Sequence, residues 1–255
     1  MEFFNFLVRW GHLLFGITWI GMLYYFNFVQ GGYFKQATPE ALADAKSKLA
    51  PSALWWFRWG AAYTWLTGLL LLFLLYYHGD YGYAIEGGGK PTLPEGMIPF
   101  WALFAGFLFY DYDARRLAKK SEPAAMVLWA AFVIWVAYIL RENLGHSSRS
   151  VLVHVGAMFG TSMAANVWMH IWPAQKRIIT AIKDGDAPSP DDVSLATMRS
   201  RHNTYMSVPL LLLMLSVHDI GQFSADPVWY AGIVISVGWL ATYGCYKMSA
   251  NVKGF

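Results

Sequence analysis

The chain has 255 residues, of which 56% are hydrophobic, 18% aromatic and only 14% charged. Because a soluble domain usually carries about 25% charged residues, this composition argues against a soluble enzyme, a disordered chain and a nucleic-acid-binding protein. The formal net charge is only +3, and the single cysteine, Cys245, rules out a disulfide within the chain.

Membrane-spanning helices are predicted along most of the sequence. A run of about 20 apolar residues forms a helix that matches the roughly 30 Å hydrocarbon core of a bilayer. The sequence holds seven such runs, of which the third is the shortest. We therefore expect an all-α polytopic membrane protein with a single helical domain over residues 1–255. The predicted spans are residues 4–29, 53–77, 97–112, 123–140, 151–172, 204–221 and 227–246.

Basic residues determine the predicted orientation. Most of the 19 Lys and Arg residues lie in the loops after spans one, three and five and in the tail after span seven. The positive-inside rule then places the N-terminus outside and the C-terminus in the cytoplasm. This alternation requires the short third span, which supports the prediction of that span.

Capping and turn residues predict where shorter helices begin and end. The Thr-Pro-Glu run at 38–40 is typical of a helix start, and that helix is expected to end near Pro51. Gly185 is expected to end the extension of span five. The Ser-Pro pair at 189–190 predicts the start of the helix that leads into span six.

Histidines are the most informative polar residues, because a polar side chain at membrane depth needs a partner or a function. The predicted orientation places His12, His154 and His218 at one outer level, on spans one, five and six. His170 and His202 share an inner level on spans five and six. His78 and His146 are expected to be solvated loop or interface residues.

Histidines on different helices at one depth are typical of haem binding, since neutral imidazole is a common axial ligand of haem iron. His154 and His218 meet this requirement on consecutive antiparallel spans, and so do His170 and His202. The two histidines on each of these spans are 16 residues apart, which turns a helix by roughly 160° beyond whole turns and separates their faces. One outer b-type haem is therefore favoured, and two haems stay possible.

Small residues near the outer histidines favour a flat ligand, because they let a macrocycle approach the backbone. His12 has Gly16 and Trp19 on its face, so it is a third candidate ligand, or a group that holds a propionate or a quinone. His202 is a candidate for a haem propionate or a lipid phosphate. The alternative for the small residues is helix packing alone. Those after His154 are Gly156, Ala157, Gly160, Thr161, Ser162, Ala164 and Ala165.

Several motifs together resemble one family, the membrane domain of bacterial membrane-bound urate hydroxylases, also called the urate oxidase N-terminal domain. The resemblance covers most of the chain. Its motifs are residues 9–12, 16–21, 56–59, 64–68, 154–158, 165–167, 173–175 and 199–205, the last leading through Pro209 to residues 215–218.

The resemblance implies a haem-type membrane core in a bacterial cytoplasmic (inner) membrane, with His12, His154, His202 and His218 at positions that match the family pattern. His170 departs from the pattern, which is usually apolar there. The family pattern also has an acidic residue at the position of Gly60 and a Tyr-Pro pair at 219–220, where this chain has Asp-Ile. Members usually continue into a cytochrome c domain, whereas this sequence stops at Phe255.

Three functions follow as hypotheses. The first is a b-type haem protein that transfers electrons between a quinone or dehydrogenase donor and a separate periplasmic cytochrome c. The second is urate hydroxylation in the membrane, with the electrons passed to that cytochrome. The third is a non-redox seven-helix subunit of a larger complex, whose histidines bind no cofactor.

Overall fold

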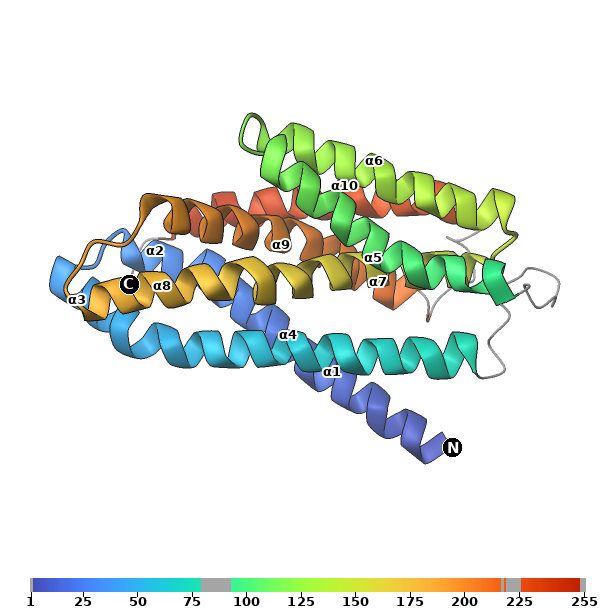
Figure 1. Cartoon of the computed structure of the whole chain (residues 1–255), viewed down its shortest axis with the longest axis horizontal. Helices are drawn as coiled ribbons and strands as arrows, with labels where there is room; N and C mark the ends of the chain where they lie inside the picture. Colours follow the sequence, from blue (N-terminus) through green and yellow to red (C-terminus); the bar gives the residue numbers. More distant parts are fainter. Residues whose placement is uncertain (1, 79–92, 217, 219–225, 253–255) are drawn as a thin grey trace. The chain divides into compact units, whose positions relative to one another are not determined.

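The computed structural model describes residues 2–78, 93–216, 218 and 226–252. These residues are helical along nearly their whole length, and they contain no β-strand, which confirms the all-α prediction. The helical segments in chain order (Figure 1) are α1 (Glu2–Tyr24), η1 (Tyr25–Gln30), α2 (Gly31–Phe34), α3 (Pro39–Asp44), η2 (Ala45–Leu49), α4 (Ala50–Leu72), η3 (Phe73–Tyr77), α5 (Leu93–Arg116), α6 (Glu122–Tyr138), η4 (Ile139–Asn143), α7 (Ser148–Asn166), η5 (Val167–Ile171), α8 (Trp172–Lys183), α9 (Pro190–Ser216) and α10 (Pro227–Ala250).

Five helical segments are long and apolar enough to cross a membrane. They are residues 2–34, 39–77, 122–143, 148–183 and 227–250, which correspond to predicted spans one, two, four, five and seven. Helices α5 and α9 do not meet the same criterion among the described residues, because α5 ends in Asp and Arg residues and α9 begins with a polar stretch. Spans three and six therefore stay predictions.

Local capping signals agree with the observed helix starts. Helix α3 begins at Pro39, and the Thr38 hydroxyl accepts a hydrogen bond from the Ala41 amide. Helix α8 ends at Lys183, just before Gly185, whose φ of 83° lies in the left-handed region that favours glycine. Helix α9 begins at Pro190, as predicted.

The prediction that a short helix ends near Pro51 is wrong, since α3, η2 and α4 form one continuous helical segment over 39–77. Segments labelled η are π-helical turns, in which the hydrogen-bond register changes. Pro51 is the second residue of α4, which follows such a turn, η2. A proline inside a helix removes one backbone hydrogen bond, so it fits beside a turn in which the hydrogen-bond register already changes.

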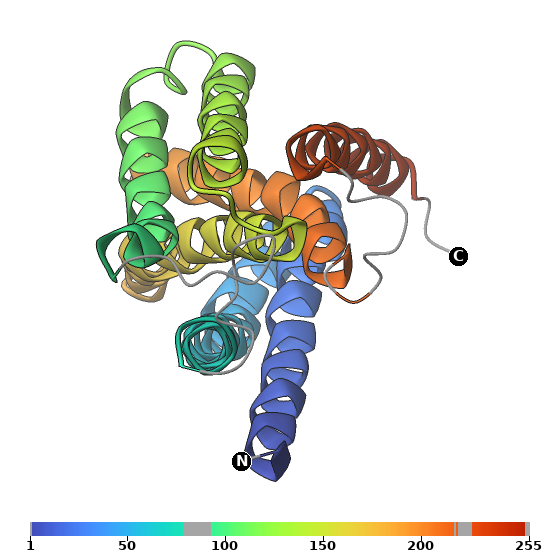
Figure 2. The ribbon, with the colours of Figure 1, turned by 90° about the vertical axis from the view of Figure 1, so that its right-hand side faces the viewer.

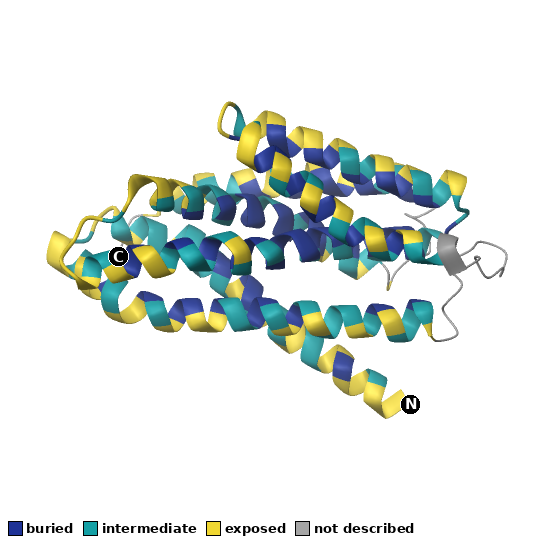
Figure 3. Cartoon of the chain, in the orientation of Figure 1, coloured by how far each residue is buried: buried dark blue, intermediate teal, exposed yellow. Residues whose placement is uncertain are grey.

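The chain divides into two compact units. Unit 1 comprises Met1–Thr67, Met163–Tyr205 and Leu240–Phe255, and unit 2 comprises Gly68–Ser162 and Met206–Trp239. Figure 3 shows that buried positions follow most of α7, whereas exposed positions predominate along α1.

A buried polar network connects helices of unit 1. The Asn166 side-chain amide donates to Asn203 Oδ1 at 2.9 Å, and Asn203 in turn donates to the Met163 carbonyl at 3.0 Å. Arg199 donates to Asn166 Oδ1 at 3.1 Å. Both asparagines are completely buried and Arg199 is almost so. Because these buried side chains bond to one another across the two helices, the network favours one register of α7 against α9.

Close backbone approaches also position the helices. In unit 1, a Cβ added at Gly60 would lie 3.1 Å from the Trp19 backbone nitrogen, so α4 approaches α1 closely there. In unit 2, α5 and α6 lie side by side in both views (Figures 1 and 2), and the Trp129 indole donates to the Gly106 carbonyl between them. The tightest approach is at Gly238 of α10, where an added Cβ would lie 2.6 Å from Pro209 Cδ.

We predict that Gly238→Ala destabilises the protein by about 1–3 kcal/mol, because the new methyl group overpacks the contact with the Pro209 ring and its backbone. Gly244→Ala on the same helix is the matched control, since an added Cβ there meets nothing within 4 Å. The control should be neutral or slightly stabilising through helix propensity. Thermal unfolding in detergent measures both, and equal midpoints for the two variants would contradict the prediction.

We also predict that Asn203→Ala destabilises the protein by about 1–3 kcal/mol, because it leaves the buried Asn166 amide and the Met163 carbonyl without their partner. The control is Asn251→Ala, which removes only an exposed hydrogen bond to the Lys247 carbonyl and should change stability by less than about 0.5 kcal/mol. The same thermal measurement compares them, and a neutral Asn203→Ala variant would show that the network does not hold these helices.

Candidate functional site

His154 lies at the centre of a buried polar cluster in unit 2. The residue is on the first half of α7 and is only 1% exposed. Its Nδ1 lies 2.7 Å from the Ser150 carbonyl oxygen and 3.3 Å from the Ser150 hydroxyl. On the other side of the ring, Nε2 lies 2.9 Å from the hydroxyl of Tyr77, the last residue of η3. The Tyr76 ring meets His154 edge-on.

These contacts define the tautomer of His154. A backbone carbonyl can only accept a hydrogen bond, so Nδ1 carries the proton and Nε2 carries the lone pair. The Tyr77 hydroxyl therefore donates to Nε2. Imidazoles that bind metals are commonly prepared in this way, with one ring N–H held by a carbonyl and the other nitrogen directed at the ligand.

His146 belongs to the same cluster, so its predicted place in a solvated loop is wrong. It precedes α7 and is only 1% exposed, because the chain turns back between η4 and α7 and its Nδ1 lies 3.1 Å from the Ser150 hydroxyl. Arg141 donates to the His146 carbonyl at 3.1 Å, which closes this turn. Burial lowers the pKa of His146 to about 4, so its ring is neutral at pH 7. His78, by contrast, is exposed as predicted.

His12 has a corresponding arrangement in unit 1. Its Nδ1 lies 2.9 Å from the Thr64 carbonyl and 3.1 Å from the Thr67 hydroxyl, both on α4. The carbonyl again requires the proton on Nδ1, which leaves the lone pair on Nε2. Gly16, one turn along α1, lies against the Thr64 methyl, with 3.8 Å between that carbon and an added Cβ. Trp19 is buried against Gly60.

The remaining predicted site residues have different surroundings. His202 is buried on α9, between Arg201 and the network residue Asn203. His170 is half-buried within the π-helical turn η5. His218 lies in an exposed turn, because α9 ends at Ser216. The sequence, by contrast, predicts that span six extends to residue 221. The structure therefore places His218 in a turn and not within a membrane-spanning helix.

Two of the small residues after His154, Gly156 and Gly160, have different surroundings. Gly156 provides space for α9, since an added Cβ would lie 2.8 Å from the Met214 methyl carbon. Gly160 meets nothing within 4 Å of an added Cβ. The packing interpretation therefore holds at Gly156, whereas Gly160 has room beside the backbone.

Sequence reasoning missed the residues that pair with the predicted histidines. Tyr77, Ser150 and Thr64 are ordinary residues in the sequence, and their roles depend on which helices meet. A weak signal existed for Ser150 and His154, because residues four apart lie on one face of a helix. Among the described residues there is no group of three or more His, Cys, Asp or Glu side chains arranged to hold a metal ion.

Comparison with known families gives a match over most of the chain. A model of the family described as urate oxidase N-terminal matches residues 28–249, which include His154, His170, His202 and His218 and begin after His12. Comparison with curated proteins and with solved structures found no match. Because the matched region covers far more than half of the sequence, the chain belongs to the urate oxidase N-terminal family.

Proposed function

We propose that this chain is a membrane-embedded b-type haem protein that transfers electrons between a quinone or dehydrogenase donor and a separate periplasmic cytochrome c. The observation that carries the proposal is the imidazole of His154 in unit 2, whose Nδ1 proton is held by a backbone carbonyl. His12 of unit 1 is held by a carbonyl in the same way and is a candidate ligand by itself. Each ring thereby directs the lone pair of Nε2 away from its own anchor. The family and the apolar helices support a redox role in a membrane.

The donor chemistry of these residues fits haem iron, which takes neutral imidazole nitrogen. Bound haem would supply reversible one-electron chemistry. The protein's part is to hold each ring in one tautomer and to exclude water around it. His12 is the better prepared ligand, since both of its hydrogen bonds to described residues are made by Nδ1. At His154, the Tyr77 hydroxyl has to turn away from Nε2 before iron can bind there.

Further features of the proposal concern topology and secondary site residues. We infer seven spans from the apolar runs, and a bacterial inner membrane from the family resemblance. The distribution of Lys and Arg residues places the N-terminus outside and the C-terminus in the cytoplasm. His202 and His170 are proposed to face a propionate or a second haem rather than to ligate the first. If His218 binds iron, it does so from the turn that follows α9.

Urate oxidation is the second candidate function, and the description of the matched family favours it. In this version the membrane core oxidises urate and releases the electrons to a cytochrome c. A non-redox membrane subunit is the remaining alternative, and it predicts a protein without visible absorption.

We predict that the purified protein shows the visible spectrum of low-spin haem b and that His154→Ala loses most of the haem, because an iron ligand is removed. His12→Ala tests the candidate ligand of unit 1 in the same way. His78→Ala is the control, since its ring is exposed and should leave the spectrum unchanged. Tyr77→Phe should keep the haem, because it removes only the competing hydroxyl. Haem quantified per chain is the measurement.

Wild-type spectra in both His12→Ala and His154→Ala would refute this ligand assignment. His218→Ala then becomes the deciding variant, and haem loss there alone would move the ligand to the turn after α9. A wild-type protein that binds no haem would favour the non-redox alternative.

We predict that the purified, haem-containing protein reduces added cytochrome c when a reduced quinone is supplied. The test for the second candidate replaces the quinol by urate and follows the same absorbance change of the cytochrome. Reduction with urate alone would establish the enzymatic function, whereas reduction with quinol alone would leave the electron-transfer role. No reduction with either donor would contradict the proposed exchange with cytochrome c.

A further inference from the structure

Arg58 of α4 has an unusual environment in unit 1. Its guanidinium lies over the Trp172 ring at 3.9 Å and near the Trp168 ring at 5.9 Å. Its backbone carbonyl accepts a hydrogen bond from the Trp168 indole at 3.0 Å. The buried Nε of Arg58 has no hydrogen-bond partner, and no acidic side chain in the described part of the chain pairs with the guanidinium.

An arginine in such surroundings needs an anion. Residues 39–77 are long and apolar enough to span a membrane, and an ionisable side chain within such a segment is costly unless it has a partner. Stacking on an indole uses only the face of the guanidinium. Its N–H groups lie in the plane of the fork, in a geometry that matches two oxygens of a phosphate or carboxylate.

The aromatic residues around Arg58 indicate its depth in the membrane. Trp55, Trp59 and Tyr63 form a row of ring contacts along α4, and Trp59 meets Trp168 edge-on at 5.3 Å. Trp55 and Trp56 are about half exposed. Tryptophan and tyrosine gather at the headgroup level of a bilayer, which places Arg58 next to lipid phosphates.

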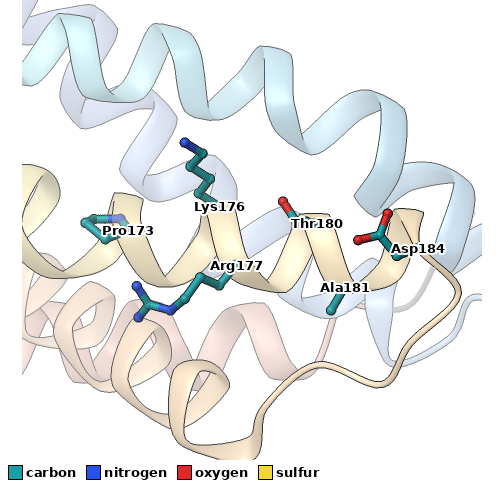
Figure 4. Close-up of a pocket in the computed structure, with 6 residues that line it drawn as sticks. All are labelled: Pro173, Lys176, Arg177, Thr180, Ala181 and Asp184. Atoms are coloured by element: carbon teal, nitrogen blue, oxygen red, sulfur yellow. The ribbon is translucent and has the colours of Figure 1, made fainter.

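Helix α8 supplies a second cation close to this level. Trp172, Lys176 and Thr180 are spaced four apart and therefore share one face of the helix. A shallow open hollow along α8 is lined by Pro173, Lys176, Arg177, Thr180, Ala181 and Asp184 (Figure 4).

The two basic residues of this hollow differ in their partners. Figure 4 shows Lys176 and Arg177 extending from opposite sides of α8. Arg177 makes a bidentate pair with Asp192 of α9, with 3.1 and 3.0 Å from Nε to the two carboxylate oxygens. Lys176 is exposed and makes no such pair with a described residue. Lys176 is therefore the cation on the Trp172 face that is available to an anion.

We propose that Arg58, stacked on Trp172 and assisted by Lys176, binds the phosphate of an anionic phospholipid. The guanidinium contacts the phosphate oxygens, the indole rings lie at the headgroup level, and Lys176 gives the site its preference for a net negative headgroup. The site is made of unit 1 residues alone and does not depend on haem or on the proposed electron transfer.

The test uses the full chain in detergent, depleted of lipid and then titrated with phosphatidylglycerol or phosphatidylcholine. Native mass spectrometry counts bound lipid, and thermal unfolding measures the stabilisation that a ligand of the folded state produces. Wild type should bind phosphatidylglycerol in preference to phosphatidylcholine. Arg58→Gln should weaken phosphatidylglycerol binding by about tenfold or more, because a charge-assisted bidentate contact is lost.

Two further variants sharpen the comparison. Arg116→Gln is the matched control, since Arg116 also lies over an aromatic ring, that of Tyr112 at 4.5 Å, and should keep full lipid binding. Arg58→Lys should bind with intermediate strength, because it keeps the charge and loses the fork. If Arg58→Gln fails to fold, Lys176→Gln replaces it, and this exposed variant should lower the preference for phosphatidylglycerol without changing stability in lipid-free detergent.

Three results would overturn the proposal. Unchanged phosphatidylglycerol binding in Arg58→Gln, or in Lys176→Gln where that variant is used, would show that these cations are not the site. Equal binding of the two lipids by wild type would remove the preference for an anionic headgroup. Inorganic phosphate that stabilises the lipid-free protein as well as phosphatidylglycerol does would identify a site for free phosphate instead.

Discussion

Polar groups buried among apolar helices have to find their partners inside the protein, and this constraint shapes both units. Neither lipid nor an apolar side chain can replace a lost hydrogen bond with water. In unit 2, Ser150 and Tyr77 therefore hold the two nitrogens of His154. In unit 1, Asn166 and Asn203 pair with each other. For the helices that carry these groups, the bonds favour one rotation of the helix about its axis.

Glycine explains one departure from the family pattern. The resemblance implies an acidic residue where this chain has Gly60, and a Cβ at that position would already lie 3.1 Å from the Trp19 backbone nitrogen. A longer side chain would separate α1 from α4, and α4 carries the Thr64 carbonyl that anchors His12. Close packing at Gly60 therefore supports the candidate haem ligand indirectly.

The motif residues that carry the family resemblance have two kinds of role in the structure. Asn166, Arg199 and Asn203 form the buried network of unit 1, so their role is to hold helices together. His154 and its neighbours instead present a neutral imidazole with a defined tautomer, which is a chemical role. Arg58 also lies within a motif, and its stacked guanidinium has a charge that the described residues leave unmatched. Binding functions are therefore argued from His154, His12 and Arg58 rather than from the whole motif set.

Local chemistry in the sequence determined the helical class, five of the spans, and the helix boundaries at Pro39, Gly185 and Pro190, because capping and hydrophobic length act within a few residues. It also identified His12 and His154 as unusual, since a histidine in an apolar run is visible without a fold. Only the tertiary structure decided that His146 is buried, that Tyr77 meets His154 and that Arg58 stacks on Trp172. Tyr77 and His154 are 77 positions apart in the sequence, and Arg58 and Trp172 are 114 positions apart. No local pattern specifies them, because they depend on which faces of the helices meet.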